Sequence, residues 1–218
     1  MQPKKFEHVT NRQGVQLADF AREEKVSREQ FAQFLKDEQR RKKFFEEIRN
    51  GNDWFLKLQK SAEKIGGRVY LIPKLVVDYT RPHNEAAMAG GPQTGSNYNV
   101  LKVADKYQPS ENKATEETIV LFNWPKGGGS YSKAIEWGLS NGLLRTTPHV
   151  SFAIGEQKLN LNYELGPNPM YVVETTGCSF EGHSNACYVW WNVARRESNL
   201  SWQGDFGYGL GWFAFRKK

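Results

Sequence analysis

Both cysteines of the chain lie in one short segment, "GCSFEGHSNACYVWW" at 177–191, with a histidine between them. The spacing Cys178-x4-His183-x3-Cys187 fits three zinc ligands, a hairpin disulfide, a thiol with its base, or two small core residues. A closed structural zinc site needs four ligands, and this segment supplies at most three. A histidine at a hairpin tip is poorly held for work as the base of a cysteine nucleophile. We therefore expect no metal and no cofactor here.

Strand-like sequences flank both cysteines, so the residues between them predict a β-hairpin that turns at Glu181 to Ser184. Equal offsets from that turn place Cys178 and Cys187 opposite each other, where oxidation could bridge them. The start of the chain has no apolar run typical of a signal peptide. We expect a cytoplasmic protein with reduced thiols and no membrane partner.

A second candidate is "QLADFAREEKVSREQFAQFLKDE" at 16–38, which has the layout of a helix-turn-helix. Ala21 would lie where the helices cross, and Ser27 would cap the second helix. The residues predicted to contact nucleic acid are Lys25, Arg28, Gln30, Gln33, Arg40, Arg41, Lys42 and Lys43. Lys25 stands where such turns usually have glycine, so a helical pair that only packs on the protein is the alternative.

A third candidate is "TIVLFNWPKGGGSYSKAIEWGL" at 118–139, a strand followed by a glycine-rich turn and a helix. Backbone amides and a helix N-terminus in this order can bind an anion. The predicted anion-binding residues are Lys126, Gly127, Gly128, Gly129, Ser130, Ser132 and Lys133. The alternative is a plain connection in which a serine caps the helix.

The C-terminal segment alternates glycines with large residues in "DFGYGLGWFAF" at 205–215. One strand face is then bare backbone, which something must approach closely: a helix, a neighbouring sheet or a flat ligand ring. Trp190, Trp191 and Trp202 occur nearby, so stacking of bases or sugars is one interpretation. A tryptophan-rich core is the other, and we favour it.

Helices and strands must position these candidates, and the sequence changes character near Gly66 and Gly67. Apolar residues recur at helical spacing before this point, which predicts a helical region at 1–66. The region 67–218 predicts a mostly antiparallel sheet with one helix at about 132–144 and a long loop at about 80–117. The expected strands are "RVYLIPKLVVDY", "TIVLFNW", "HVSFAIG", "MYVVETT", "CYVWWNVA" and "YGLGWFAF". The fold class is therefore α+β.

The 218 residues carry a net charge of +6, which permits an acidic partner such as nucleic acid. No paired carboxylates or other catalytic constellation can be recognised, so binding is favoured over catalysis. We expect a binding or regulatory protein that contacts nucleic acid or another protein. A small-ligand or phosphate binder or an enzyme centred on 126–133 is the first alternative, and an assembly component with a tryptophan-rich interface is the second.

Overall fold

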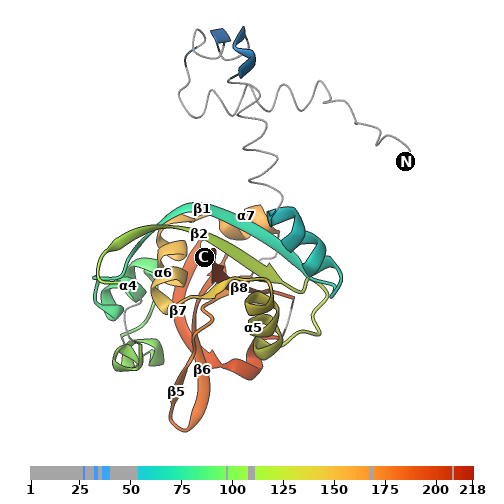
Figure 1. Cartoon of the computed structure of the whole chain (residues 1–218). Helices are drawn as coiled ribbons and strands as arrows, with labels where there is room; N and C mark the ends of the chain where they lie inside the picture. The colour runs from blue at the N-terminus through green and yellow to red at the C-terminus, as the bar shows by residue number, and fades with distance from the viewer. Residues whose placement is uncertain are drawn as a thin grey trace. The chain divides into compact units, whose positions relative to one another are not determined.

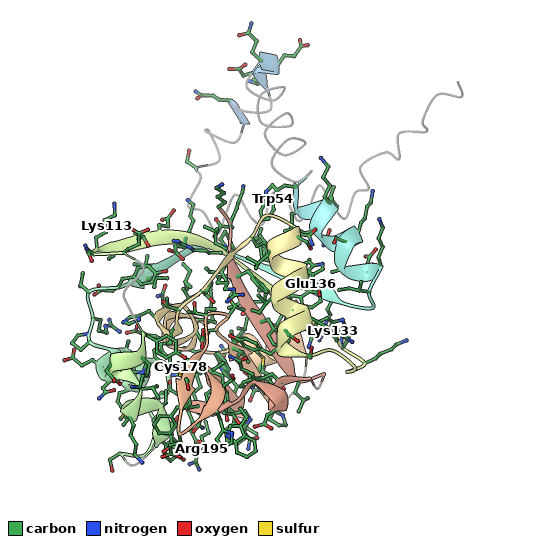
Figure 2. The ribbon with its side chains drawn as sticks, turned by 60° about the horizontal axis from the view of Figure 1, so that its bottom comes forward. Trp54, Lys113, Lys133, Glu136, Cys178 and Arg195 are labelled. Atoms are coloured by element: carbon green, nitrogen blue, oxygen red, sulfur yellow. The ribbon has the colours of Figure 1, made fainter. Side chains whose placement is uncertain are left out.

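The computed structural model divides the chain into two compact units, 1–56 and 57–218. It describes residues 27, 32–33, 36–39, 54–96, 98–107, 111–166, 169–207 and 209–218. Residues 54–63 are helical in the described part of the chain, and Trp54 is labelled in Figure 2. The division falls ten residues before the change of composition at Gly66, because residues 57–65 pack with the sheet. Within this unit, Trp137 donates to Ser61 and the Trp124 indole donates to the carbonyl of Ile65.

The second unit is an α+β fold built on an eight-stranded mixed sheet (Figure 1). Its strands are β1 (Arg68–Asp78), β2 (Ala114–Asn123), β3 (Leu144–Arg145), β4 (Met170–Val173), β5 (Cys178–Phe180), β6 (His183–Asn192), β7 (Arg195–Trp202) and β8 (Gly211–Arg216). Its labelled helices are α4 (His83–Gly90), α5 (Tyr131–Ser140), α6 (Pro148–Gln157) and α7 (Leu161–Leu165), with 3-10 turns η1 (Asn99–Lys102), η2 (Ala104–Lys106) and η3 (Gln203–Phe206).

The strand order is β1-β2-β8-β4-β6-β5, while β3 pairs with β8 and β7 pairs with β6. Every described pairing is antiparallel except that of β4 with β8. The β5–β6 hairpin extends beyond the rest of the unit in Figure 1. The sheet is therefore antiparallel in its main part, as the sequence predicts.

The middle of the sheet is buried on both faces, which explains why the second half of β2, residues 119–122, and most of β8 are continuous apolar runs. On one face Leu121, Trp212 and Ala214 join the main hydrophobic core together with residues of α4 and α6. On the opposite face Phe122 stacks on Trp137 of α5, with ring centroids 4.1 Å apart. We call these the α6 face and the α5 face.

The segment "HVSFAIG", expected as a strand, is a helix. Residues Pro148 to Gly155 of α6 are all buried, the polar His149 and Ser151 among them, so this stretch has no exposed face and shows no 3.6-residue period. Pro148 stands at the first helical position, where its fixed φ and missing N–H favour a helix. That proline is the local signal against a strand.

The long loop expected at about 80–117 is largely structured, because it contains α4, η1 and η2 and reaches into β2. Helix α4 packs closely on α6. Gly90 permits this approach, because a Cβ at that position would meet the Cα of Phe152 at 2.7 Å. The prediction of a single helix after residue 67 is likewise wrong, since α4, α6 and α7 accompany α5. Short helices of small residues carry little amphipathic signal, which is why α4 escapes notice in the sequence.

Candidate ligand-binding site on the sheet

A pocket of about 360 Å³ lies on the α5 face, at the strands that α5 does not cover. It is lined by Tyr171, Tyr188, Trp190, Glu197, Asn199, Ser201, Asp205 and Phe206, and we call it the aromatic pocket. A cavity of this size is at the lower end of the range that small molecules occupy in proteins. The pocket is therefore the candidate functional site.

Strand register brings the pocket residues together from distant parts of the chain. Trp190 of β6 is paired with Tyr171 of β4 on one side and with Glu197 of β7 on the other. Tyr188 is paired with Asn199 in the same way. Because side chains alternate along a strand, these five point to one face while their neighbours Val172, Val189 and Trp191 join the core on the other.

Three aromatic rings form the floor of the pocket. The ring centroids of Tyr171, Tyr188 and Phe206 lie 5.4 to 5.8 Å apart, and each pair is tilted by 57° to 73°. Such edge-to-face contacts hold rings in fixed orientations. Tyr171 comes from β4, Tyr188 from β6, and Phe206 from η3, which follows β7 directly.

Two carboxylates stand on the polar side of the pocket. Glu197 is only 5% exposed, and its Oε1 forms an ion pair with Arg195. Its Oε2 accepts long hydrogen bonds of 3.4 Å from the hydroxyl of Tyr98 and the amide of Asn199. Arg195 itself is exposed and lies at the edge of the unit in Figure 2. The ion pair therefore anchors Glu197 from outside the pocket.

Asp205 is exposed, and its Oδ2 accepts a 2.5 Å hydrogen bond from the Ser201 hydroxyl. The tyrosine beside the two carboxylates responds to them: burial, followed by the charges of Asp205 and Glu197, raises the pKa of Tyr188 to about 12. Tyr188 therefore keeps its proton at neutral pH. The polar wall consists of carboxylate, amide and hydroxyl groups, and none of the lining residues is Lys, Arg or His.

Residues Pro92 to Thr94 hold the outer edge of β7 in place. Pro92 forms a bridge with Glu197, and the amide of Ser198 donates to the Thr94 hydroxyl at 2.8 Å. The amide of Arg196 donates to Gln93 Oε1 at 2.7 Å. Side chains on a paired strand keep their positions better than side chains on loops, so the pocket is largely preformed.

The predicted anion-binding loop is accounted for by local geometry. Ser130 caps α5 by accepting a 3.2 Å hydrogen bond from the amide of Lys133, and its hydroxyl lies 3.1 Å from that of Ser132. Gly127 and Gly128 have φ of 72° and 84°, which favour glycine. Lys126 is exposed, as is Lys133, which lies on α5 in Figure 2.

Gly129 lies against the ring of Trp124, where a Cβ would collide. Backbone conformation therefore accounts for glycine at 127 and 128, packing accounts for Gly129, and Ser130 caps α5. The anion site stays a prediction.

The same loop explains Gly207 and Gly209 among the alternating glycines of the C-terminal segment. A Cβ on Gly209 would meet the carbonyl oxygen of Pro125 at 2.6 Å, and one on Gly207 would meet that of Gly129 at 2.7 Å. At Gly207 and Gly209 the bare backbone is therefore approached by other backbone, whereas a Cβ on Gly211 would collide with the ring of Tyr171. Trp191 and Trp212 are fully buried, as expected for a tryptophan-rich core, while Trp190 lines the pocket.

The cysteine hairpin forms, but its register differs from the expected one. Phe180 pairs with His183, so the turn has only two central residues, Glu181 and Gly182, both with positive φ. Cys178 then lies opposite Asn185 and not opposite Cys187. Both thiols are free in the structure. Within the described residues there is no cluster of three or more His, Cys, Asp or Glu side chains that could hold a metal ion.

Most of the predicted nucleic-acid-binding residues lie outside the described residues: Lys25, Arg28, Gln30, Arg40, Arg41, Lys42 and Lys43. Gln33 is described, and it is exposed in a helical segment. The prediction of nucleic-acid binding therefore stays a prediction.

Sequence reasoning singled out Trp190 but missed the rest of the aromatic pocket. The polar strand β7, "RRESNLSW", carries three of its residues and has no apolar alternation to mark it. A pattern of Glu197, Asn199 and Ser201 at every second position was the available signal, since period two is typical of one strand face.

No protein-family model, curated protein or solved structure matches this chain. In the part of the chain that the structure describes, no helix is both long enough and apolar enough to cross a membrane.

Proposed function

We propose that the unit 57–218 is a binding module that takes a small molecule in the aromatic pocket. The observation that carries this proposal is the combination of a fixed aromatic floor with carboxylate, amide and hydroxyl groups around one cavity of about 360 Å³. Apolar surface supplies affinity in such sites, and a few placed polar groups supply orientation.

The aromatic floor favours a ligand with an apolar face. Tyr171, Tyr188 and Phe206 already pack on one another, so a ligand covers the rings from above and does not separate them. Trp190 is half-buried and adds a side wall next to Tyr171 in the sheet. Covering part of an indole removes apolar area from water at about 25 cal/mol per Å².

The polar wall favours a ligand that donates hydrogen bonds. Glu197 and Asp205 accept only, and Asn199 already directs its amide nitrogen toward Glu197. Ser201 donates its hydroxyl hydrogen to Asp205, which leaves its oxygen as an acceptor. A ligand without N–H or O–H groups would displace water from the remaining acceptor positions of these oxygens without supplying a donor, at a cost in binding free energy.

Saturation-transfer NMR with a library of small polar aromatics, amines and sugars tests the proposal. The full chain should give hits that are lost in Trp190→Ala, whose side chain lines the pocket but is not fully buried. Tyr163→Ala is the matched control, because Tyr163 is 59% exposed on α7 and does not line the pocket. Equal melting temperatures of the two variants show that folding is intact.

The proposal fails if the library gives no hits, or if every hit binds Trp190→Ala as well as it binds the parent protein. The control variant should retain all hits. A loss in Tyr163→Ala of the same size would place the binding site elsewhere on the unit.

A further inference from the structure

The aromatic pocket is acidic in a protein that is basic as a whole. The chain carries 30 Lys and Arg against 24 Asp and Glu, yet the described residues that line the pocket include two carboxylates and no basic side chain, although Arg195 beside the lining pairs with Glu197. The low-dielectric walls of a pocket strengthen the field of the charges at its surface. The local field therefore selects a ligand of positive charge and disfavours phosphates and carboxylates.

Arg195 does not satisfy Glu197 completely. Its guanidinium pairs with Oε1, whereas Oε2 has only two long contacts of 3.4 Å, from Tyr98 and Asn199. A carboxylate accepts about four hydrogen bonds, so Glu197 retains capacity for a strong donor. Because Arg195 already pairs with Glu197, the charge that remains without an ion pair among the described lining residues is that of Asp205, and a neutral ligand that covered Asp205 would bury this charge uncompensated, which is unfavourable.

The aromatic floor also suits a cation, because ring faces carry negative electrostatic potential. Tyr171, Tyr188 and Phe206 all line the pocket, and their rings meet at mutual angles of 57° to 73°, so they do not share one plane. Burial, and after it the charges of Asp205 and Glu197, raises the pKa of Tyr188 to about 12. The raised pKa keeps the tyrosine hydroxyl neutral, so the ring adds no charge of its own.

We propose that the ligand is a small organic cation whose ammonium or guanidinium group is held by Glu197 and Asp205 and whose apolar body covers Tyr188 and Trp190. The inference rests on the proposed function and specifies its ligand class. Charge-assisted hydrogen bonds from N–H to carboxylate are about twice as strong as neutral ones, which gives the pocket its preference.

Isothermal titration calorimetry of the full chain with matched probes tests the inference. Phenethylamine is a cation at pH 7, 2-phenylethanol is its neutral counterpart, phenylacetate is the anionic one, and methyl glucoside represents sugars. Phenethylamine should bind at least tenfold more tightly than 2-phenylethanol, and phenylacetate should not bind. Raising the salt concentration from 50 to 500 mM should weaken binding of the cation several-fold by screening.

Asp205→Asn is the main variant, because Asp205 is exposed and its loss leaves no buried charge unpaired. The substitution should weaken the affinity for phenethylamine about tenfold and leave the affinity for 2-phenylethanol unchanged. Glu136→Gln is the matched control, an exposed carboxylate on α5 that does not line the pocket (Figure 2). It should leave every affinity as in the parent protein.

The outcomes separate the ligand class from the pocket. If 2-phenylethanol or methyl glucoside binds as tightly as phenethylamine and the binding of both is lost in Trp190→Ala, the aromatic pocket is a binding site but its preference for cations is refuted. Equal affinity of phenethylamine for the parent and for Asp205→Asn also overturns the cation. If none of the probes and no member of the wider library binds in a way that depends on Trp190, the proposed function falls as well.

Discussion

The hydroxyl of Tyr107 donates a 2.8 Å hydrogen bond to Oε1 of Glu174, a carboxylate that is completely buried. Glu174 follows the last residue of β4, and its carboxylate also accepts from the backbone amides of Thr176, Gly177 and Cys187. Four residues, 174–177, separate β4 from β5, while only Ala186 and Cys187 separate their partners in β6. Strand β6 therefore pairs with β4 and β5 on either side of an irregular segment, and the Glu174 carboxylate accepts hydrogen bonds from amides of that segment and of β6 opposite it.

We predict that this carboxylate makes stability depend on pH. Burial raises the pKa of Glu174 to about 7, against the lowering effect of the donated hydrogen bonds. Between pH 4.5 and 7 the folded state holds a proton that the unfolded chain has released, so the free energy of unfolding falls as pH rises. The fall amounts to about 3 kcal/mol when a shift of this size is converted at 1.36 kcal/mol per unit. Urea unfolding at several pH values measures it.

Glu174→Gln removes the titrating group, and the fall between pH 4.5 and 7 should disappear even if the variant is less stable. In Tyr107→Phe the pKa of Glu174 loses a lowering contribution, so the fall should extend above pH 7. His83 acts in the opposite direction, because burial lowers its pKa and stability is lost as pH drops through that value. A parent-like slope in Glu174→Gln would show that another group is responsible.

The contact of Gly209 with the loop after β2 yields a second prediction. Gly209→Ala should lower the free energy of unfolding by about 1 to 3 kcal/mol, because its Cβ would collide with the carbonyl of Pro125, a backbone atom that cannot move alone. Gly204→Ala is the control, since nothing lies within 4 Å of its added Cβ. Denaturant midpoints compare the two. A Gly209→Ala variant as stable as the control would show that the loop shifts freely.

The strands with β-branched and aromatic residues could be predicted from the sequence, and so could α5 with its serine cap. These features are local: composition marks β1, β2, β4, β6 and β8, and Ser130 marks the start of α5. The α+β class follows from them. What the sequence misassigned, α6, has no exposed face over Pro148 to Gly155, because α4 and the sheet cover it.

The candidate site could not be predicted in the same way, because it depends on register. Trp190 and Trp191 are adjacent and chemically identical, yet one lines the pocket and the other is fully buried. A shift of one residue in the pairing of β6 would exchange them. Tyr171, Glu197 and Asp205 meet only after β4, β6, β7 and η3 have assembled, and no local spacing records that meeting.

The register of the cysteine hairpin predicts that Cys178 and Cys187 do not form a bridge. Cys178 faces Asn185, so Cys187 is two positions away on the neighbouring strand. Diagonal Cβ atoms on paired strands lie about 7 Å apart, whereas a disulfide needs about 4 Å. Mild oxidation should leave two titratable thiols in the denatured protein, as mass spectrometry after alkylation would show. A mass loss of two hydrogens with no free thiol would contradict the register.

Thiol reactivity should also be low in the folded protein. Burial raises the pKa of Cys187 well above its ordinary value and raises that of half-buried Cys178 less strongly. The thiolate is the reactive form, so both groups should react more slowly with Ellman's reagent than the thiol of a small peptide. Cys187 is buried, so its reaction should require local unfolding. Cys178→Ala isolates Cys187, and an immediate reaction of that variant would contradict its burial.

The basic N-terminal segment leads to the last prediction, which concerns nucleic acid. If Arg40, Arg41, Lys42 and Lys43 contact phosphates, binding of the full chain to a mixed-sequence duplex should weaken steeply with salt, because each contact releases condensed counterions. Replacing these four residues by Gln should reduce the slope of log K against log salt concentration by about 0.9 per lost contact. The control replaces four exposed lysines of the second unit, Lys64, Lys74, Lys102 and Lys113, which removes the same charge from another place. Fluorescence anisotropy measures both. An equal loss in the two variants would assign the binding to net charge alone, and no binding by the parent protein at low salt would remove the nucleic-acid hypothesis.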